Sequence, residues 1–224
     1  PIIKRLQEDP FFDFKLLVSG AHVEENFGES VTEIKEDNID IFELIKITAK
    51  KESMDYTPKS IADVIDGVSR VIKVQKPDYF MVYADRFESF AACIASTQMS
   101  IPTIHIEGGD LTLGGALDDS VRHAMTRLAH FHMTTNEQAS KRLIQMGEEA
   151  WRVETVGFTG IDLIKQAKFS NEEETLSRLK LDAHRPIILF TQHSITTEEN
   201  KIKEQFLPSI EALVELSKEN MQII

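Results

Sequence analysis

The chain has 224 residues, of which 42% are hydrophobic, enough to bury the core of one large domain or of two ordinary ones. Its formal net charge of −12 argues against a general nucleic-acid binder, because that function needs a basic face. A single cysteine, Cys93, excludes a disulfide or structural zinc framework and is expected to be buried and inert. Neither a membrane span nor a secretion signal is evident, so we expect a cytoplasmic protein.

The N-terminal part of the chain predicts helices and strands in alternation. Residues 1–8 have the pattern of a helix already in progress, and Pro1 as the first residue looks like a cut in a longer protein. Residues 12–20 predict a buried strand that runs into a loop containing His22. Three elements follow: an amphipathic helix at 28–38, an alternating strand at 39–47 and a helix at 57–76.

From residue 79 onwards the alternation becomes regular. Residues 79–84, YFMVYA, form a continuous apolar run, which is typical of a central parallel strand. The helices and strands expected after it are RFESFAACIASTQ, PTIHIE, DDSVRHAMTRLAHF, MTT, NEQASKRLIQMGE and RVETVG. Such an alternation predicts an α/β fold with a parallel sheet that is covered on both faces.

Acidic residues follow two neighbouring strands of this predicted sheet. Asp85 comes directly after YFMVYA, and Glu107 ends the strand PTIHIE. Because ligands of parallel α/β sheets bind at the carboxyl ends of the strands, we expect both acids to line one crevice.

Two Gly-Gly pairs, at 108–109 and 114–115, lie between Glu107 and the next predicted helix. Glycine lets a backbone come close to a ligand, and Asp118 or Asp119 can accept hydrogen bonds from the first-turn amides of that helix. Together these features are typical of a polar ligand site. The simpler interpretation is a loop whose acids only cap a helix, and the second acid at a strand end favours the ligand site over it.

After Gly160 the chain becomes more polar and begins a second unit. A charged helical crossing leads to the strand PIILFTQH, which ends at His193, and a long amphipathic helix and the strand MQII follow. This unit has too few strands to bury a core alone. We therefore predict two domains, an N-terminal one at 1–168 whose first strand is missing and a truncated C-terminal one at 169–224.

Several candidate side chains also have structural interpretations. Asp85 and Glu88 lie at a helix entrance, where carboxylates interact favourably with the helix dipole. Arg86 fits either a surface residue or a ligand for phosphate or carboxylate. Asp118 and Arg122 have the spacing of an i, i+4 ion pair.

The histidines divide in the same way. His105 alternates with apolar neighbours and is expected to be a satisfied histidine of the sheet, and His130 and His132 are also interpreted as structural. His193 follows a strand of the second unit, where it can face the cleft between domains. No cluster has metal-ligand spacing, and no dinucleotide or Walker motif is present, so we expect neither metal nor cofactor.

Five motifs of the chain resemble the UDP-N-acetylglucosamine 2-epimerase family, in particular its hydrolysing branch, which makes N-acetylmannosamine for sialic acid synthesis. They are DRFE at Asp85, HIEGGD at His105, LDDSVRHAMTRLAH at Leu117, TQH with TTE at Thr191, and SGAH with FGES near His22. The resemblance implies two Rossmann-like domains of the glycosyltransferase-B type, both incomplete in this chain. It also implies a UDP-sugar bound between the domains and a homodimer.

The resemblance further implies an elimination of UDP to 2-acetamidoglucal, followed by hydration to the free 2-epimer. Carried over by motif, Asp85, Glu107 and Asp118 are the acid–base carboxylates, and His193 is a catalytic or phosphate-proximal residue. Three further residues carry over as substrate-binding or orienting groups: Arg86, Arg122 and, more weakly supported, His22. Three carboxylates near one sugar would have divergent pKa values, which is how such sites obtain both an acid and a base.

The chain departs from the family pattern in two ways. Ala84 stands where glycine is usual, and Ser194 with Ile195 replaces the usual Pro-Val after the histidine. The family's first strand with its arginine loop, and most of its nucleotide site, would lie outside the 224 residues.

Three other functions stay open. The long GGDLTLGGALDD loop fits a hydrolysing 2-epimerase of UDP-2,4-diacetamido-trideoxy-glucose, on the legionaminic acid route. A non-hydrolysing 2-epimerase is a further enzyme reading, although that branch usually has a different acid loop. A non-catalytic nucleotide-sugar sensor is the alternative from another class, and the intact set of acids argues against it.

Overall fold

The computed structural model describes residues 1–23, 30–50, 53–112, 117–166, 169–193 and 201–224, which form two compact units, Pro1–Asp162 and Leu163–Ile224. The helices of the first unit are α1 (Ile2–Glu8), α2 (Ser30–Glu36), α3 (Tyr56–Gln75), α4 (Phe87–Gln98), α5 (Leu117–Leu128) and α6 (Glu137–Gln145), with the 3₁₀ turns η1 (Gly20–Val23) and η3 (Ala150–Arg152). Its strands are β1 (Leu16–Ser19), β2 (Ile41–Ile45), β3 (Phe80–Tyr83), β4 (Thr103–Ile106), β5 (Phe131–Thr134) and β6 (Val153–Thr155).

The strands of the first unit form two parallel sheets. One contains β3, β4, β5 and β6 in chain order, and the other contains β1 and β2. In the larger sheet Tyr83 pairs with Ile106, and Ile106 pairs with Met133, so the carboxyl ends of these strands lie at one edge. The predicted parallel α/β architecture is confirmed.

One expectation about β3 is wrong. The sequence predicted a central strand in a sheet covered on both faces, whereas β3 is an edge strand of the larger sheet within the described residues. Val82 is buried, but Met81 and Tyr83 are 37% and 45% exposed. A continuous apolar run cannot distinguish a strand that is covered on both faces from one whose second face is open.

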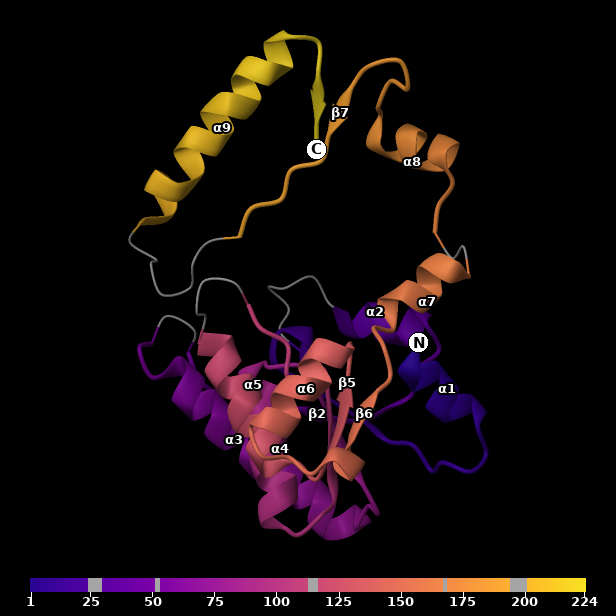
Figure 1. The fold of residues 1–224 in the computed structure, drawn as a ribbon, viewed down its shortest axis with the longest axis vertical. Helices are drawn as coiled ribbons and strands as arrows, with labels where there is room; N and C mark the ends of the chain where they lie inside the picture. The colour runs from indigo at the N-terminus through magenta and orange to yellow at the C-terminus, as the bar shows by residue number, and fades with distance from the viewer. Residues whose placement is uncertain (24–29, 51–52, 113–116, 167–168, 194–200) are drawn as a thin grey trace. The chain divides into compact units, whose positions relative to one another are not determined.

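Two hydrophobic clusters join the helices to the strands, and α3, α4 and α5 lie side by side along them (Figure 1). The first cluster includes Ile45 of β2, Val68 of α3 and Ala91 of α4. The second unites Val82, Cys93 and Met125, from β3, α4 and α5. Cys93 is fully buried, as predicted, and burial raises the pKa of its thiol to about 12. These contacts fix α4 and α5 relative to β3.

The second unit begins within α7 (Gly160–Lys165) and continues with α8 (Glu172–Leu179), β7 (Ile187–Ile188), α9 (Ile202–Lys218) and β8 (Gln222–Ile223). Asn171 and Glu174 form a capping box at the start of α8. The parallel strands β7 and β8 make a two-stranded sheet, and none of the residues of α8 or α9 is buried in the described part of the chain. No helix among the described residues combines the length and apolar character needed to cross a bilayer.

Candidate active site

The ends of β3 and β4 bring two predicted acids to one edge of the larger sheet. Tyr83 pairs with Ile106, Glu107 follows that pair directly, and Asp85 follows after one further residue. Ala84 and Glu107 have φ angles of 56° and 63°, in the left-handed region that costs a residue with a side chain about 1 kcal/mol. Both strands therefore turn sharply where the acids lie.

Arg122, in the second turn of α5, connects Asp85 to the loop after β4. Its Nη2 forms an ion pair with Asp85, while its Nη1 donates to the Asp110 carbonyl at 2.8 Å and lies 3.3 Å from Asp119. The side chains of Asp85 and Arg122 are only 19% and 11% exposed. The predicted ion pair between Asp118 and Arg122 is wrong, because Asp85 and Asp119 occupy the guanidinium instead.

Glu107 has a partner that the sequence analysis missed. The hydroxyl of Tyr83, on the neighbouring strand, donates a hydrogen bond to Glu107 Oε1. Burial first, and Glu107 second, raise the pKa of Tyr83 well above its ordinary value, so Tyr83 stays a hydrogen-bond donor. The signal that could have found Tyr83 is its strand register, since it pairs with the residue before Glu107.

Arg86 and Glu88 form a two-pronged contact at the start of α4. Arg86 Nε lies 3.1 Å from Glu88 Oε2, and Nη2 lies 2.9 Å from Oε1. Glu88, together with a smaller effect of Asp118, raises the pKa of Arg86. Asp118 itself is exposed at the start of α5.

Gly20, just after β1, lets the chain come close to the Arg86–Glu88 pair because it has no side chain. Its φ of 69° favours glycine, and a Cβ placed there would overlap the carboxylate of Glu88. Gly20 opens η1, the turn that carries the exposed His22. The structure therefore brings Asp85, Arg86, Glu107, Asp118 and Arg122 to one edge of the unit, with the turn of His22 beside Glu88.

The first glycine pair belongs to a well-fixed loop. The Asp110 carboxylate accepts hydrogen bonds from Thr135 Oγ1 at 2.8 Å and from Asn136 Nδ2 at 3.2 Å, and Arg142 donates to the Gly109 carbonyl. Asp119 accepts from the Thr112 amide at 2.9 Å. Asp119 thus binds the loop, and the second glycine pair, at 114–115, lies outside the described residues.

The predictions for the sheet histidines are confirmed. His105 is fully buried, with Nε2 2.8 Å from the Ala84 carbonyl, and His130 Nδ1 accepts from the Thr103 amide at 3.1 Å. His132 contacts Glu148, whose carboxylate also binds two arginines. We call this set the Glu148 cluster: His132, Glu148, Arg127 and Arg152. Arg152 directly precedes β6, so the cluster lies at the amino ends of the strands, opposite Asp85 and Glu107.

His193 lies in the second unit. It is exposed in the segment that follows β7, and residues 194–200, including Ser194 and Ile195, lie outside the described residues. A shared site of His193 with the three acids stays a prediction.

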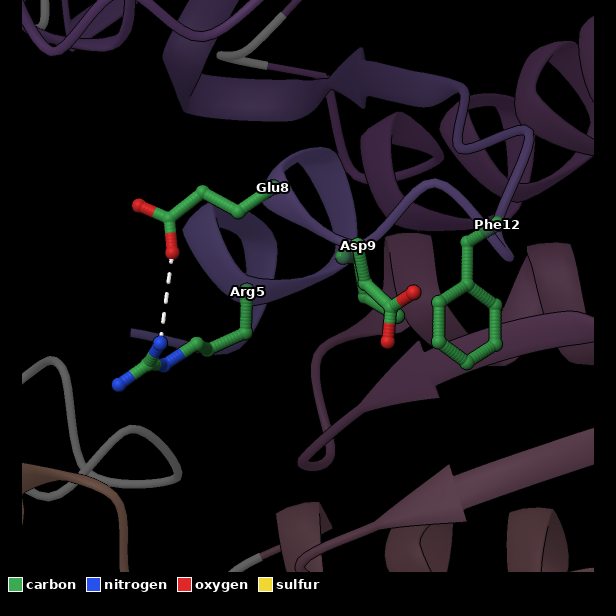
Figure 2. A pocket seen from close by; sticks show the side chains of 5 residues that line it. Arg5, Glu8, Asp9 and Phe12 are labelled. Carbon is green, nitrogen blue, oxygen red and sulfur yellow. Dashed lines mark hydrogen bonds and ion pairs between the residues drawn. The ribbon is translucent and has the colours of Figure 1, made fainter.

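A separate hollow lies beside α1. Its volume is about 270 Å³, and Arg5, Leu6, Glu8, Asp9 and Phe12 line it. Figure 2 shows Arg5 turned toward Glu8, to which its Nη1 donates at 3.4 Å. No predicted site residue lines this hollow. Within the described ranges, no three His, Cys, Asp or Glu side chains gather in a way that could hold a metal ion.

Comparison with known proteins identifies relatives along the whole chain. The family model for UDP-N-acetylglucosamine 2-epimerase matches residues 4–224. The chain is 33% identical over 223 residues to a Legionella pneumophila protein named UDP-N,N'-diacetylbacillosamine 2-epimerase (hydrolyzing), covering 100% of the chain and 58% of that protein. It is 29% identical over 222 residues to a UDP-N-acetylglucosamine 2-epimerase of Neisseria meningitidis, covering 99% of the chain and 57% of that protein.

A solved structure shows the same fold. The crystal structure of UDP-GlcNAc 2-epimerase from Neisseria meningitidis bound to UDP-GlcNAc matches with a TM-score of 0.81 at 20% identity, over 100% of this chain and 62% of that one. This likeness confirms the predicted α/β fold of the glycosyltransferase-B type. The chain spans somewhat more than half the length of these relatives.

Proposed function

This chain belongs to the UDP-N-acetylglucosamine 2-epimerase family, and we propose that the full-length protein is a hydrolysing 2-epimerase of a UDP-2-acetamido sugar. The observation that supports this reaction best is the placement of Asp85 and Glu107 just after the ends of adjacent strands, with Asp85 paired to Arg122 of α5, the helix that begins with Asp118. Removal of a weakly acidic proton requires a positioned carboxylate, and several carboxylates at one edge can divide the roles of acid and base.

The proposed reaction has two steps. One carboxylate takes the proton from C2, the C1–O bond breaks, and UDP leaves with the bonding electrons, which forms 2-acetamidoglucal. Water then adds its hydroxyl to C1 and a proton to the opposite face of C2, which releases the free 2-epimer. Asp85, Glu107 and Asp118 are the carboxylates that we assign to these proton transfers, and His193 is assigned to the departing diphosphate.

The two arginines have different environments and thus different proposed roles. Arg122 is largely buried and engaged with Asp85, Asp110 and Asp119, which fits an orienting role. Glu88 holds Arg86 through Nε and Nη2. Because the Arg86 side chain is 61% exposed, we propose that its guanidinium also binds the diphosphate.

The substrate has two candidates. The Legionella relative favours UDP-N,N'-diacetylbacillosamine, a 2,4-diacetamido sugar, because its identity of 33% exceeds the 29% of the Neisseria relative, which favours UDP-N-acetylglucosamine. The test is incubation of the full-length protein with each nucleotide sugar in deuterated water, followed by NMR. We expect UDP and a free 2-epimer with deuterium at C2. Release of the UDP-linked 2-epimer would instead identify the non-hydrolysing reaction.

We propose the same domain organisation as the sequence predicted, with an N-terminal Rossmann-like domain at 1–168 and the start of a second at 169–224. Among the described residues β1 and β3, like β2 and β6, have one strand partner each, so the open edges of β1 and β3 leave room for the first strand that we propose; in the full-length protein β3 would then have a partner on each side. In the full-length protein we also propose a homodimer, which sedimentation equilibrium can test.

The 224-residue chain alone is expected to be inactive. It spans 58% of the Legionella relative, and the proposed nucleotide site needs the remainder of the second domain. A coupled assay for UDP release, run beside the full-length protein at equal concentration, checks this. Measurable turnover by the isolated chain would contradict the proposed domain organisation.

Gly20→Ala is expected to raise the KM for the nucleotide sugar about tenfold with little change in kcat, because the new methyl group displaces Glu88 and releases Arg86. Gly157→Ala is the matched control, since Gly157 also has a positive φ, of 87°, but a Cβ there would meet nothing within 4 Å. Steady-state kinetics of both variants check the prediction. An equal KM in the two variants would argue against the role of Arg86.

A further inference from the structure

His105 contacts two elements besides its own strand. Its Nε2 lies 2.8 Å from the Ala84 carbonyl at the end of β3, and its Nδ1 lies 3.3 Å from Thr126 Oγ1 in α5. The ring is fully buried, and a Cβ at Gly108 would approach Nδ1 to 3.0 Å and Thr126 Oγ1 to 3.2 Å. The loop after β4 therefore closes over the imidazole and leaves it little room to move.

The residues that His105 contacts lie in the segments that carry the proposed acids. Ala84, with its left-handed φ of 56°, directly precedes Asp85. Thr126 lies one turn after Arg122 in α5, and its Oγ1 is 3.1 Å from the Arg122 carbonyl. Glu107, also left-handed at 63°, is two residues beyond His105 in the same chain. One side chain thus connects the ends of β3 and β4 with the helix that carries Asp118 and Arg122.

The chemistry of the contacts defines the state of the ring. The Ala84 carbonyl can only accept, so Nε2 carries the proton. The Thr126 hydroxyl donates its one hydrogen to the Arg122 carbonyl at 3.1 Å, and its oxygen lies 3.3 Å from Nδ1. Burial lowers the pKa of His105 to about 4. The hydrogen bond to Ala84 acts against this shift, and the nearby His132 and Arg122 act with it. At neutral pH His105 is therefore an uncharged imidazole whose Nε2 donates to the end of β3, which suits a fixed support better than proton transfer.

We propose that His105 is a positioning residue of the active site: it holds the strained turn at Ala84, the end of β4 and α5 in the relation that points the carboxylates at one sugar. This inference rests on the proposed function. His105 does not face the substrate, and it acts through the residues that do. The strain at Ala84 and Glu107 persists only where surrounding contacts enforce it, and the His105 hydrogen bond to Ala84 is such a contact.

The chain contains a matched control. His132 is also buried, and it is the residue of β5 that pairs with His105 across the sheet. Its side-chain partner is Glu148, in the cluster at the opposite ends of the strands. If both histidines were merely structural, replacing either one would change kcat by a similar factor. If His105 is a positioning residue, only its replacement lowers kcat.

The test compares His105→Leu, His105→Gln and His132→Leu in the full-length protein. We expect His105→Leu to lower kcat roughly 100-fold with a KM within about threefold of the parent, because small misplacement of catalytic groups has effects of this size. His105→Gln, whose amide can donate in place of Nε2–H, should restore kcat to within about tenfold of the parent. The folded fraction of His132→Leu should keep kcat within about threefold. Equal losses of kcat in the two leucine variants would overturn the proposal.

A second readout does not depend on activity, so it separates this inference from the proposed function. Hydrogen exchange measured by mass spectrometry should rise in peptides covering 84–88 and 107–112 in His105→Leu, and stay at the parental level there in His132→Leu. In ¹⁵N NMR, the His105 ring should show the neutral Nε2–H form between about pH 6 and 9. Unchanged exchange in His105→Leu, or a charged or Nδ1–H ring, would refute the positioning role even if the protein is an epimerase.

Discussion

Glu107→Gln in the full-length protein is expected to lower kcat by roughly 10² to 10⁴-fold, the contribution typical of a positioned general acid or base. Glutamine keeps the size of the side chain and an oxygen that can accept the hydrogen bond of the Tyr83 hydroxyl, but it cannot carry the proton of C2. The change therefore isolates proton transfer from packing. Steady-state kinetics with UDP release as the readout check this, with a melting curve to confirm folding.

Glu154→Gln is the control for this substitution. Glu154 is an exposed glutamate of β6 in the same sheet, and no site role is proposed for it. Its variant should keep the parental kcat. Full turnover by Glu107→Gln would remove Glu107 from the acid–base set. A parent protein that binds the nucleotide sugar but shows no turnover would favour the nucleotide-sugar sensor.

Glu148→Gln is expected to give the largest loss of stability, about 3 kcal/mol, because it leaves the buried end of the Glu148 cluster without its negative charge. The Glu148 side chain is 3% exposed and that of His132 is 0% exposed, whereas Arg127 is 55% exposed and partly screened by water. The expected loss is therefore at the low end for a broken buried ion pair. Urea unfolding of the parent and the variant measures the difference.

Glu149→Gln provides the comparison. Glu149 is the next residue and also contacts Arg152, at 3.3 Å, but its side chain is 64% exposed. Solvent screening reduces such a pair to less than about 1 kcal/mol. Similar losses in the two variants would contradict the assignment of the buried cluster as the stabilising element. Because the cluster lies at the amino ends of the strands, kcat of folded Glu148→Gln should stay close to that of the parent.

The features that follow from local pattern were predictable from the sequence. The βα alternation predicts the parallel strands, and their direction predicts that Asp85 and Glu107 lie at one edge, as the structure shows. The helical pattern around Cys93 indicated burial, and the alternation around His105 indicated a satisfied histidine of the sheet; the structure confirms both. Boundaries were less accurate: the strand expected at 39–47 is β2 at Ile41–Ile45, since strand ends depend on pairing rather than on the apolar pattern.

The contacts that depend on tertiary structure were not predictable. Helical spacing favoured Asp118 as the partner of Arg122, but the end of a strand 37 residues away supplies Asp85 instead. Tyr83 likewise reaches Glu107 across 24 residues, through a strand register that sequence periodicity does not specify. Its exposure also shows that an apolar run says little about whether both faces of a strand are covered.

The central claim is that carboxylates at the ends of β3 and β4 and at the start of α5 break the C2–H bond of a nucleotide sugar. The most direct measurement follows the hydrogen at that carbon. A substrate carrying deuterium at C2 is incubated with the full-length protein in ordinary water, and the released sugar is analysed by mass spectrometry. We predict complete loss of the deuterium from the free 2-epimer. A free sugar that retains both the deuterium and the original configuration at C2 would show that this bond stays intact and would contradict the assignment.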